Sequence, residues 1–248
     1  REIPKDRRNK KWISSEVQFK LTEIYRKSKT IPFLLAWMVS QLLFSEELNL
    51  LIWEIFHRYR MVQLCLSQST ADLEGILSLQ RENLLTILSE EEKAAQGFVT
   101  IPHTLDQLEA MHSIAPHVLA KENEQVVGYV LAMTLASRSV VPMMTSLFDN
   151  FDELEVAGKK VTSYRPMVVG QVCVGKSQRG TGLFDKLYTS YREQYASTHD
   201  FAITSIALSN YRSMAAHQRV GFQVIHTFED SIQPWSIVYW DWNSKFPQ

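Results

Sequence analysis

The stretch Met167-Val-Val-Gly-Gln-Val-Cys-Val-Gly-Lys-Ser-Gln-Arg-Gly-Thr-Gly-Leu183 decides the fold. Its first eight residues are rich in β-branched side chains, which is typical of a buried strand. Residues 175–182 contain three glycines, and this composition indicates a loop. After the loop, large apolar and aromatic residues recur every four positions, at Leu183, Leu187, Tyr191 and Tyr195. The stretch therefore predicts a strand, a glycine-rich loop and a helix.

Part of this stretch matches the triphosphate-binding P-loop pattern G-x-x-x-x-G-K-[ST], at Gly170–Ser177. In that motif the four middle residues form a cradle for phosphates, and a helix begins at the lysine. Here the four middle residues are strand formers, and two further glycines follow Lys176. These glycines disfavour a helix that starts at Lys176, so we interpret the match as coincidence.

The loop immediately downstream, Gln178–Gly182, fits a different ligand. It joins the strand ending at Val174 to the helix starting at Leu183, so its successive backbone N–H groups would face one point at the positive end of a helix dipole. Glycines remove the Cβ atoms that would block a close approach, and Arg179 adds a positive charge. The loop suits a pyrophosphate group. The alternative is an ordinary glycine-rich turn.

The rest of the chain carries alternating strand and helix signals. Strands are expected at 62–66, 118–120, 126–134, 201–208, 222–228 and 235–242, with the second and third forming a hairpin. Helices are expected at 71–79, at a capping box beginning at 89, at 104–111, near 143–154, and from 210 to Gly221. We therefore expect one α/β domain over residues 61–248.

Residues 1–60 differ in character, with apolar residues at helical spacing that predict a helical N-terminal extension. This extension is either native or upstream sequence before a start at Met61. The uncharged run at 31–45 is fifteen residues long, short of the ~20 needed to span a bilayer. No membrane span is predicted.

Composition excludes several classes of protein. Residues 1–61 carry 12 Lys and Arg against 7 Asp and Glu, whereas residues 62–248 carry 14 against 20, so no overall basic field for nucleic acid exists. The only cysteines, Cys65 and Cys173, lie inside apolar runs and do not indicate a disulfide framework. We expect a cytoplasmic protein and no metal site.

Two segments together resemble the GNAT superfamily of N-acetyltransferases. The loop at 178–183 is similar to the superfamily's (Gln/Arg)-x-x-Gly-x-(Gly/Ala) signature. The second segment matches a later pattern at Asn210, Ser213, His217 and Gly221-Phe222. The resemblance implies an α/β (α+β) fold with a mixed, mainly antiparallel central sheet flanked by helices, and acetyl-CoA as co-substrate.

The resemblance also implies a set of cofactor-binding residues. The strand before the loop would pair with the pantetheine arm through Val172, Cys173 and Val174. The pyrophosphate would bind Gln178, Arg179, Gly180, Thr181, Gly182 and Leu183, with Phe184 beside it. Asn210 would hydrogen-bond the pantetheine amides, and Ser213 is a further expected cofactor-binding residue. The alternative for Asn210 is a helix N-cap.

The chemistry implied is direct attack of a neutral amine on the acetyl thioester in a ternary complex. His217 stands where the superfamily often places a tyrosine as general acid, and its alternative is a structural role. On the strand before the loop only Gln171 is polar, and an amide cannot take a proton. The remaining candidates for the base are an ordered water or one of four side chains, and sequence spacing does not single one out. These side chains are Glu109, His103, His112 and His117.

The sequence leaves the acceptor open as a small-molecule or peptide amine. An acidic run at 149–155 would either attract a cationic amine or form a solvated helix face. The aromatic strand at 235–242 indicates core packing or a subunit interface, and a homodimer is possible. The alternative to an enzyme is a degenerate member that binds acyl-CoA as a sensor or serves as an interaction module.

Overall fold

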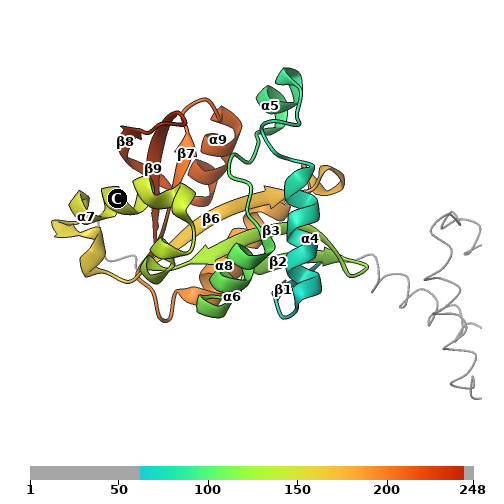
Figure 1. Ribbon diagram of the computed structural model, residues 1–248, viewed down its shortest axis with the longest axis horizontal. Helices are drawn as coiled ribbons and strands as arrows, with labels where there is room; N and C mark the ends of the chain where they lie inside the picture. Colours follow the sequence, from blue (N-terminus) through green and yellow to red (C-terminus); the bar gives the residue numbers. More distant parts are fainter. Residues whose placement is uncertain (1–61, 243–248) are drawn as a thin grey trace, which may run out of the picture. The chain divides into compact units, whose positions relative to one another are not determined.

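A computed structural model describes residues 62–242 of the 248-residue chain (Figure 1). The predicted helical extension at 1–60 lies outside the described residues. Within the described range, no helix combines the length and the apolar character needed to cross a bilayer.

A seven-stranded sheet forms the centre of the domain, in the order β1-β2-β3-β6-β7-β9-β8. Every neighbouring pair is antiparallel except β6 and β7, which run parallel. The sheet is therefore mixed and mainly antiparallel, as the sequence predicts. Its strands are β1 (Gln63–Leu66), β2 (Val118–Glu122), β3 (Gln125–Met133), β6 (Pro166–Val174), β7 (Phe201–Ala207), β8 (Gln223–Glu229) and β9 (Pro234–Asp241).

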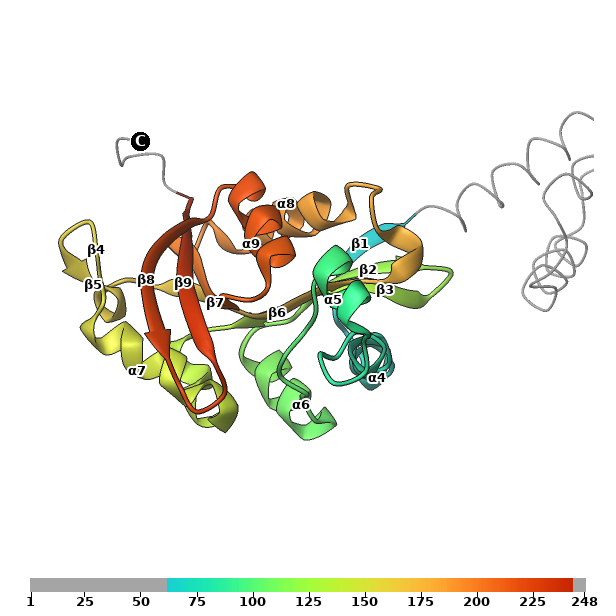
Figure 2. The same cartoon turned by 90° about the horizontal axis from the view of Figure 1, so that it is seen from above.

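Helices cover both faces of this sheet. Figure 2 shows α8 and α9 on one side and α4 and α6 on the other. Each side has its own apolar core, to which α8 contributes Tyr191 and α6 contributes Leu108. The α-helices are α4 (Thr70–Arg81), α5 (Glu90–Gln96), α6 (Leu105–Ile114), α7 (Thr145–Glu153), α8 (Leu183–Tyr195) and α9 (Tyr211–Val220).

Local signals explain where several of these elements begin. The Ser69 side chain accepts a hydrogen bond from the backbone at the start of α4. Ser89 and Thr104 form capping boxes that open α5 and α6. Between β2 and β3, Asn123 and Glu124 both have positive φ, as a tight hairpin turn requires. These starts agree with the predictions from sequence.

The acidic run after β3 forms a solvated face of α7. Phe148 and Phe151 point from this helix into the core. On the outer side, Asp152 pairs with Arg138 at 3.0 Å, and the Glu153 carboxylate lies 3.6 Å from a lysine ammonium in the small hairpin of β4 (Glu155–Val156) and β5 (Lys159–Lys160). Two acids of the run, Asp152 and Glu153, therefore have internal partners, and an amine-attracting role is not needed to explain these two.

The parallel strands β6 and β7 separate along their length. Their pairing covers only Pro166–Val168 against Phe201–Ile203, although both strands continue for several residues. Where pairing stops, the Thr204 hydroxyl donates to the Val169 carbonyl at 2.8 Å. A wedge therefore opens between the carboxyl-terminal halves of β6 and β7, at the centre of the sheet.

Candidate functional site

The glycine-rich loop after β6 has the backbone conformation that its glycines allow. Gly180 has φ of 75° and Gly182 has φ of 79°, both in the left-handed region. Gly182 is the N-cap of α8 and provides no side-chain cap. The first N–H groups of α8 lack intrahelical partners, as in any helix, and point out of its positive end. This arrangement suits an anionic group.

The residues that match the P-loop pattern, Gly170–Ser177, do not form a phosphate-binding loop, as predicted. Strand β6 includes Gly170–Val174, so the would-be phosphate cradle is extended strand. Only a 3-10 turn starts at Lys176, and the next α-helix begins at Leu183. The Lys176 ammonium instead pairs with Glu92 of α5 at 2.7 Å.

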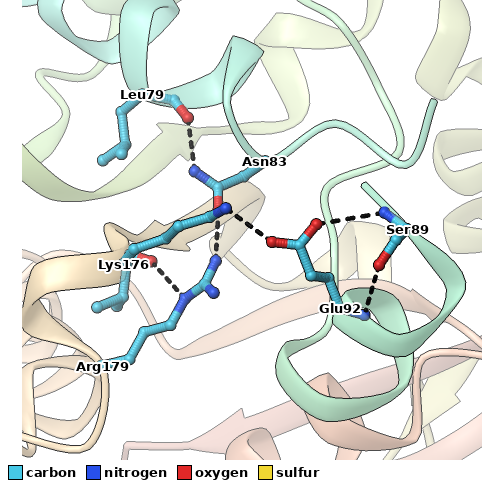
Figure 3. A network of polar contacts seen from close by, with 7 residues as sticks. Leu79, Asn83, Ser89, Glu92, Lys176 and Arg179 are labelled. Atoms are coloured by element: carbon cyan, nitrogen blue, oxygen red, sulfur yellow. Dashed lines mark hydrogen bonds and ion pairs between the residues drawn. The ribbon is translucent and has the colours of Figure 1, made fainter. Parts of the chain in front are cut away.

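A polar network fixes the glycine loop against two other helices (Figure 3). Arg179 donates to the Asn83 side-chain oxygen at 2.6 Å, and its Nε contacts the Val174 carbonyl at 3.4 Å. Asn83 in turn donates to the Leu79 carbonyl in α4 at 2.8 Å. The ion pair of Lys176 connects the same loop to α5. The loop is therefore anchored before any ligand arrives.

A cleft of about 380 Å³ extends over this loop, a volume within the usual range for ligand sites. The residues predicted to bind cofactor that line it are Val172, Cys173, Val174, Gln178, Arg179, Gly180, Gly182, Leu183, Phe184 and Ser213. Thr181 does not line it, because its hydroxyl turns back to the Gln178 carbonyl at 2.8 Å. Most of the predicted set is thus brought together in one place.

The cleft is positively charged. Three arginines line it, Arg179, Arg212 and Arg219, against one acidic side chain, Asp185. Arg219 pairs with Asp185 at 2.6 Å, which leaves a net positive excess. This charge and the helix terminus fit a ligand with several phosphates.

Sequence reasoning missed the opposite wall of the cleft, Gln96–Val99. The chain here leaves α5 and passes in front of β6 towards α6 (Figure 1). Gly97 has φ of 76°, and a Cβ there would lie 2.9 Å from the Asn210 side-chain oxygen. The glycine at position 97, directly after the capping-box helix, was the sequence signal that could have indicated this wall. Only glycine tolerates both the positive φ and the close approach of Asn210.

A second, smaller pocket of about 70 Å³ lies in the wedge between β6 and β7. We call it the wedge pocket. Its volume corresponds to about two water molecules, so it holds only a small group. No Asp, Glu, Lys or Arg lines it among the described residues, and Phe98, Val99, Val172 and Ser213 line both this pocket and the cleft. The two pockets are therefore adjacent.

Asn210 lies at the wedge pocket rather than in the cleft. Its side-chain oxygen accepts from the Ser213 N–H at 3.2 Å, which makes it the N-cap of α9. Its amide nitrogen donates to the Phe98 carbonyl at 2.9 Å. The N-cap alternative is confirmed, and a contact with pantetheine stays a prediction.

His217 is 2% exposed, and both of its ring nitrogens have partners. Nδ1 lies 2.8 Å from the Ser213 carbonyl, so it carries the proton and donates it. Nε2 therefore accepts from the Tyr188 hydroxyl at 2.7 Å. Burial lowers the pKa of His217 to about 4, so the ring is neutral near pH 7. This geometry favours a structural role for His217 over a catalytic one. Catalysis by His217 stays an untested prediction.

Gln171 of β6 lines the wedge pocket. Its oxygen accepts from Tyr129 at 2.6 Å and from Gln80 at 2.9 Å. Its nitrogen donates to the Ile101 carbonyl at 2.8 Å. Gln171 is therefore hydrogen-bonded through both its oxygen and its nitrogen, and it braces α4, β3 and the segment before α6.

None of the other candidate bases lines the cleft or the wedge pocket, namely His103, Glu109, His112 and His117. Burial lowers the pKa of His103 to about 4 and that of His117 to about 3. Glu109 is exposed on α6. Among the described residues, His217 is therefore the only titratable side chain at the wedge pocket, and both of its ring nitrogens are already engaged.

Comparison with known proteins gives a likeness in structure but not in sequence. The sequence matches no protein-family model and no curated protein. An acetyltransferase of the GNAT family from Streptococcus agalactiae superposes with a TM-score of 0.52 at 11% identity, over 73% of this chain and 95% of that chain. The chain has the GNAT fold.

Further GNAT-like structures agree in coverage. The ribosomal-protein-S18-alanine N-acetyltransferase of Escherichia coli is 10% identical over 73% of this chain and 94% of that one, with a TM-score of 0.48. An N-acetyltransferase from Staphylococcus aureus is 16% identical over 73% and 98%, with a TM-score of 0.46. The sheet order and the Streptococcus agalactiae structure confirm the fold class expected from the sequence. At 11% identity, this likeness describes the architecture alone.

Proposed function

We propose that this chain is an acetyl-CoA-dependent N-acetyltransferase that acetylates a small-molecule or peptide amine. One observation carries the proposal: a positively charged cleft over a glycine loop and helix terminus adjoins a small pocket between two separating strands. In this proposal the cleft supplies an anion site, and the wedge pocket supplies a small chamber without charged side chains among the described residues. An acyl transferase with a phosphate-bearing donor needs both, side by side.

The residues fit the co-substrate in three ways. The N–H groups around Gly180 and Gly182, with Arg179, suit its phosphates. Beyond Val168, β6 is not paired with β7, so backbone groups on that edge are available for pantetheine amides. When bound, acetyl-CoA would supply an activated acetyl thioester, with its reactive end directed to the wedge pocket.

The wedge pocket sets conditions for the acceptor. Its volume of about 70 Å³ leaves room for an acetyl group and an amine nitrogen but not for a large substituent. An uncharged lining disfavours an ammonium ion, so the amine would enter in its neutral form. We also propose the cytoplasm as its compartment, since both cysteines are free and the thiol of Cys173 is buried.

A second candidate function is an acyl-CoA sensor without turnover. The observation that favours it is Gln171, bonded through both ends of its amide where a base would be useful. A sensor would keep the cleft and its charge and need no base in the wedge pocket. Binding measurements alone do not separate the two functions.

Turnover separates them. The full chain is incubated with acetyl-CoA and a panel of amines, including α-amino peptides, polyamines and arylamines, and release of free CoA thiol is measured. We expect acetylation of at least one amine, checked by the mass of the product. Thiol release that no amine accelerates, together with tight CoA binding, would favour the sensor and overturn the enzyme proposal.

A further inference from the structure

The cleft and the wedge pocket meet at one hydroxyl group. Of the four residues that line both, Phe98, Val99 and Val172 have apolar side chains. Ser213 is the fourth, and its hydroxyl is the only side-chain O–H group in this set. A group that passes from a donor in the cleft to an acceptor in the wedge must cross this junction.

The hydroxyl proton of Ser213 is not taken up by its histidine neighbour. Ser213 Oγ lies 3.3 Å from His217 Nδ1. That nitrogen carries a proton, because it contacts the Ser213 carbonyl at 2.8 Å and a carbonyl can only accept. Towards His217, therefore, Oγ can only act as an acceptor, and its own proton can be donated elsewhere.

The position of Ser213 in α9 favours negative charge beside it. It is the third residue of a ten-residue helix, so it lies in the first turn, at the positive end of the dipole. The Asn210 cap fixes its backbone N–H at 3.2 Å. A thiolate that forms near this turn would be stabilised by the same field that stabilises anions at other helix N-termini.

We propose that the Ser213 hydroxyl carries the proton from the acceptor amine to the departing sulfur during acetyl transfer. This inference rests on the proposed function. The amine nitrogen forms a bond to the acetyl carbon, and the carbon–sulfur bond breaks with its electron pair passing to sulfur. Ser213 Oγ accepts the proton that nitrogen loses and gives its own proton to sulfur. The hydroxyl is unchanged at the end, and the products are an amide and a thiol.

Such a relay explains how the site works without a carboxylate. Nitrogen must lose one proton and sulfur must gain one, so one hydroxyl between them satisfies both needs. Among the described residues, the only titratable group at the wedge pocket is the buried His217, and the charged groups of the cleft are Arg179, Asp185, Arg212 and Arg219. None of these has to change its protonation in the relay.

The test measures the bound thiol directly. The full chain is saturated with CoA, and the thiolate is titrated by its ultraviolet absorbance in the wild type and in Ser213→Ala, Ser213→Thr and Ser209→Ala. Ser209 is exposed and lines neither pocket, so it controls for loss of a nearby hydroxyl. Losing a hydrogen bond to an anion should raise the pKa of the bound thiol by about one to two units in Ser213→Ala. Threonine and the Ser209 variant should leave it within about half a unit of the wild type.

Turnover on an amine identified with the wild type completes the test. Ser213→Ala should lower kcat about 100-fold or more while its Kd for CoA stays within about threefold. If Ser213→Ala kept the thiol pKa and the kcat of the wild type, the relay would be overturned. A complete loss of CoA binding in Ser213→Ala would also overturn it, because Ser213 would then be a binding residue. Failure of the wild type itself to acetylate any amine would instead contradict the proposed function, so the two failures are distinguishable.

Discussion

Replacing Gly180 by alanine separates the role of the loop in ligand binding from its role in folding. Gly180 has φ of 75°, and a Cβ built there has no atom within 4 Å. Gly158, in the turn between β4 and β5, has φ of 74° and equally open surroundings. It does not line the cleft. The two glycines are therefore matched in backbone conformation and space and differ in their relation to the ligand.

The expected costs follow from this match. A left-handed residue with a Cβ costs about 1–2 kcal/mol, and both Gly180→Ala and Gly158→Ala should lose that much stability. For a domain of this size the loss corresponds to a fall in Tm of about 2–8 °C. Only at Gly180 would the new methyl group stand between phosphate oxygens and backbone N–H groups. Losing one charge-assisted hydrogen bond there would weaken binding by about 10–100-fold.

Two measurements are needed, thermal unfolding without ligand and calorimetric titration with CoA. We expect similar Tm values for the two variants, with a wild-type Kd in Gly158→Ala and a raised Kd in Gly180→Ala. Dephospho-CoA as a second ligand shows whether the loss concerns the pyrophosphate, which both ligands share. Equal Kd values in the two variants would refute the assignment of the loop as a phosphate site.

Three further predictions concern the buried polar groups. His217→Phe should lower the free energy of unfolding by about 1–3 kcal/mol, because the Tyr188 hydroxyl loses its acceptor; a fall in kcat above about 100-fold at unchanged stability would instead support catalysis. Gln171→Glu should also destabilise the fold, since a carboxylate would face the Ile101 carbonyl, and it should not raise turnover; a stable and faster variant would show that a base was missing. The free energy of unfolding should fall as the pH is lowered from about 6.5 to about 4, because burial lowers the pKa of His103, His117 and His217 and only the unfolded chain takes up protons in this range. Denaturant unfolding at a series of pH values measures this fall, whose slope would reach at most about 4 kcal/mol per pH unit. A flat profile would contradict the burial of these histidines.

Features that depend on neighbouring residues in the chain were predictable from the sequence. The capping box at Ser89 needs only residues three apart, and the β2–β3 hairpin needs only its turn. The strand, loop and helix around Gly180 follow from local composition in the same way. The rejected P-loop also depended on local context, because strand-forming residues stand where a phosphate cradle would be.

Contacts between distant segments were not predictable. Arg179 is tied to Asn83, which lies 96 positions away, and nothing in either segment indicates the pair. His217 finds its second partner, Tyr188, on another helix. A pattern match could assign His217 a position in a motif but could not show that both nitrogens are engaged. The junction at Ser213 likewise depends on where two pockets meet.

Calorimetry on the full chain tests most directly whether the cleft over the glycine loop binds acetyl-CoA. Acetyl-CoA and ATP are titrated separately into the wild type and into Gly180→Ala. We predict one acetyl-CoA bound per chain, weakened about 10-fold or more in the variant, and no ATP binding that depends on Lys176. ATP is also titrated into Lys176→Ala. The absence of a binding heat with acetyl-CoA, or ATP binding that Lys176→Ala abolishes, would contradict the assignment of the cleft as an acetyl-CoA site.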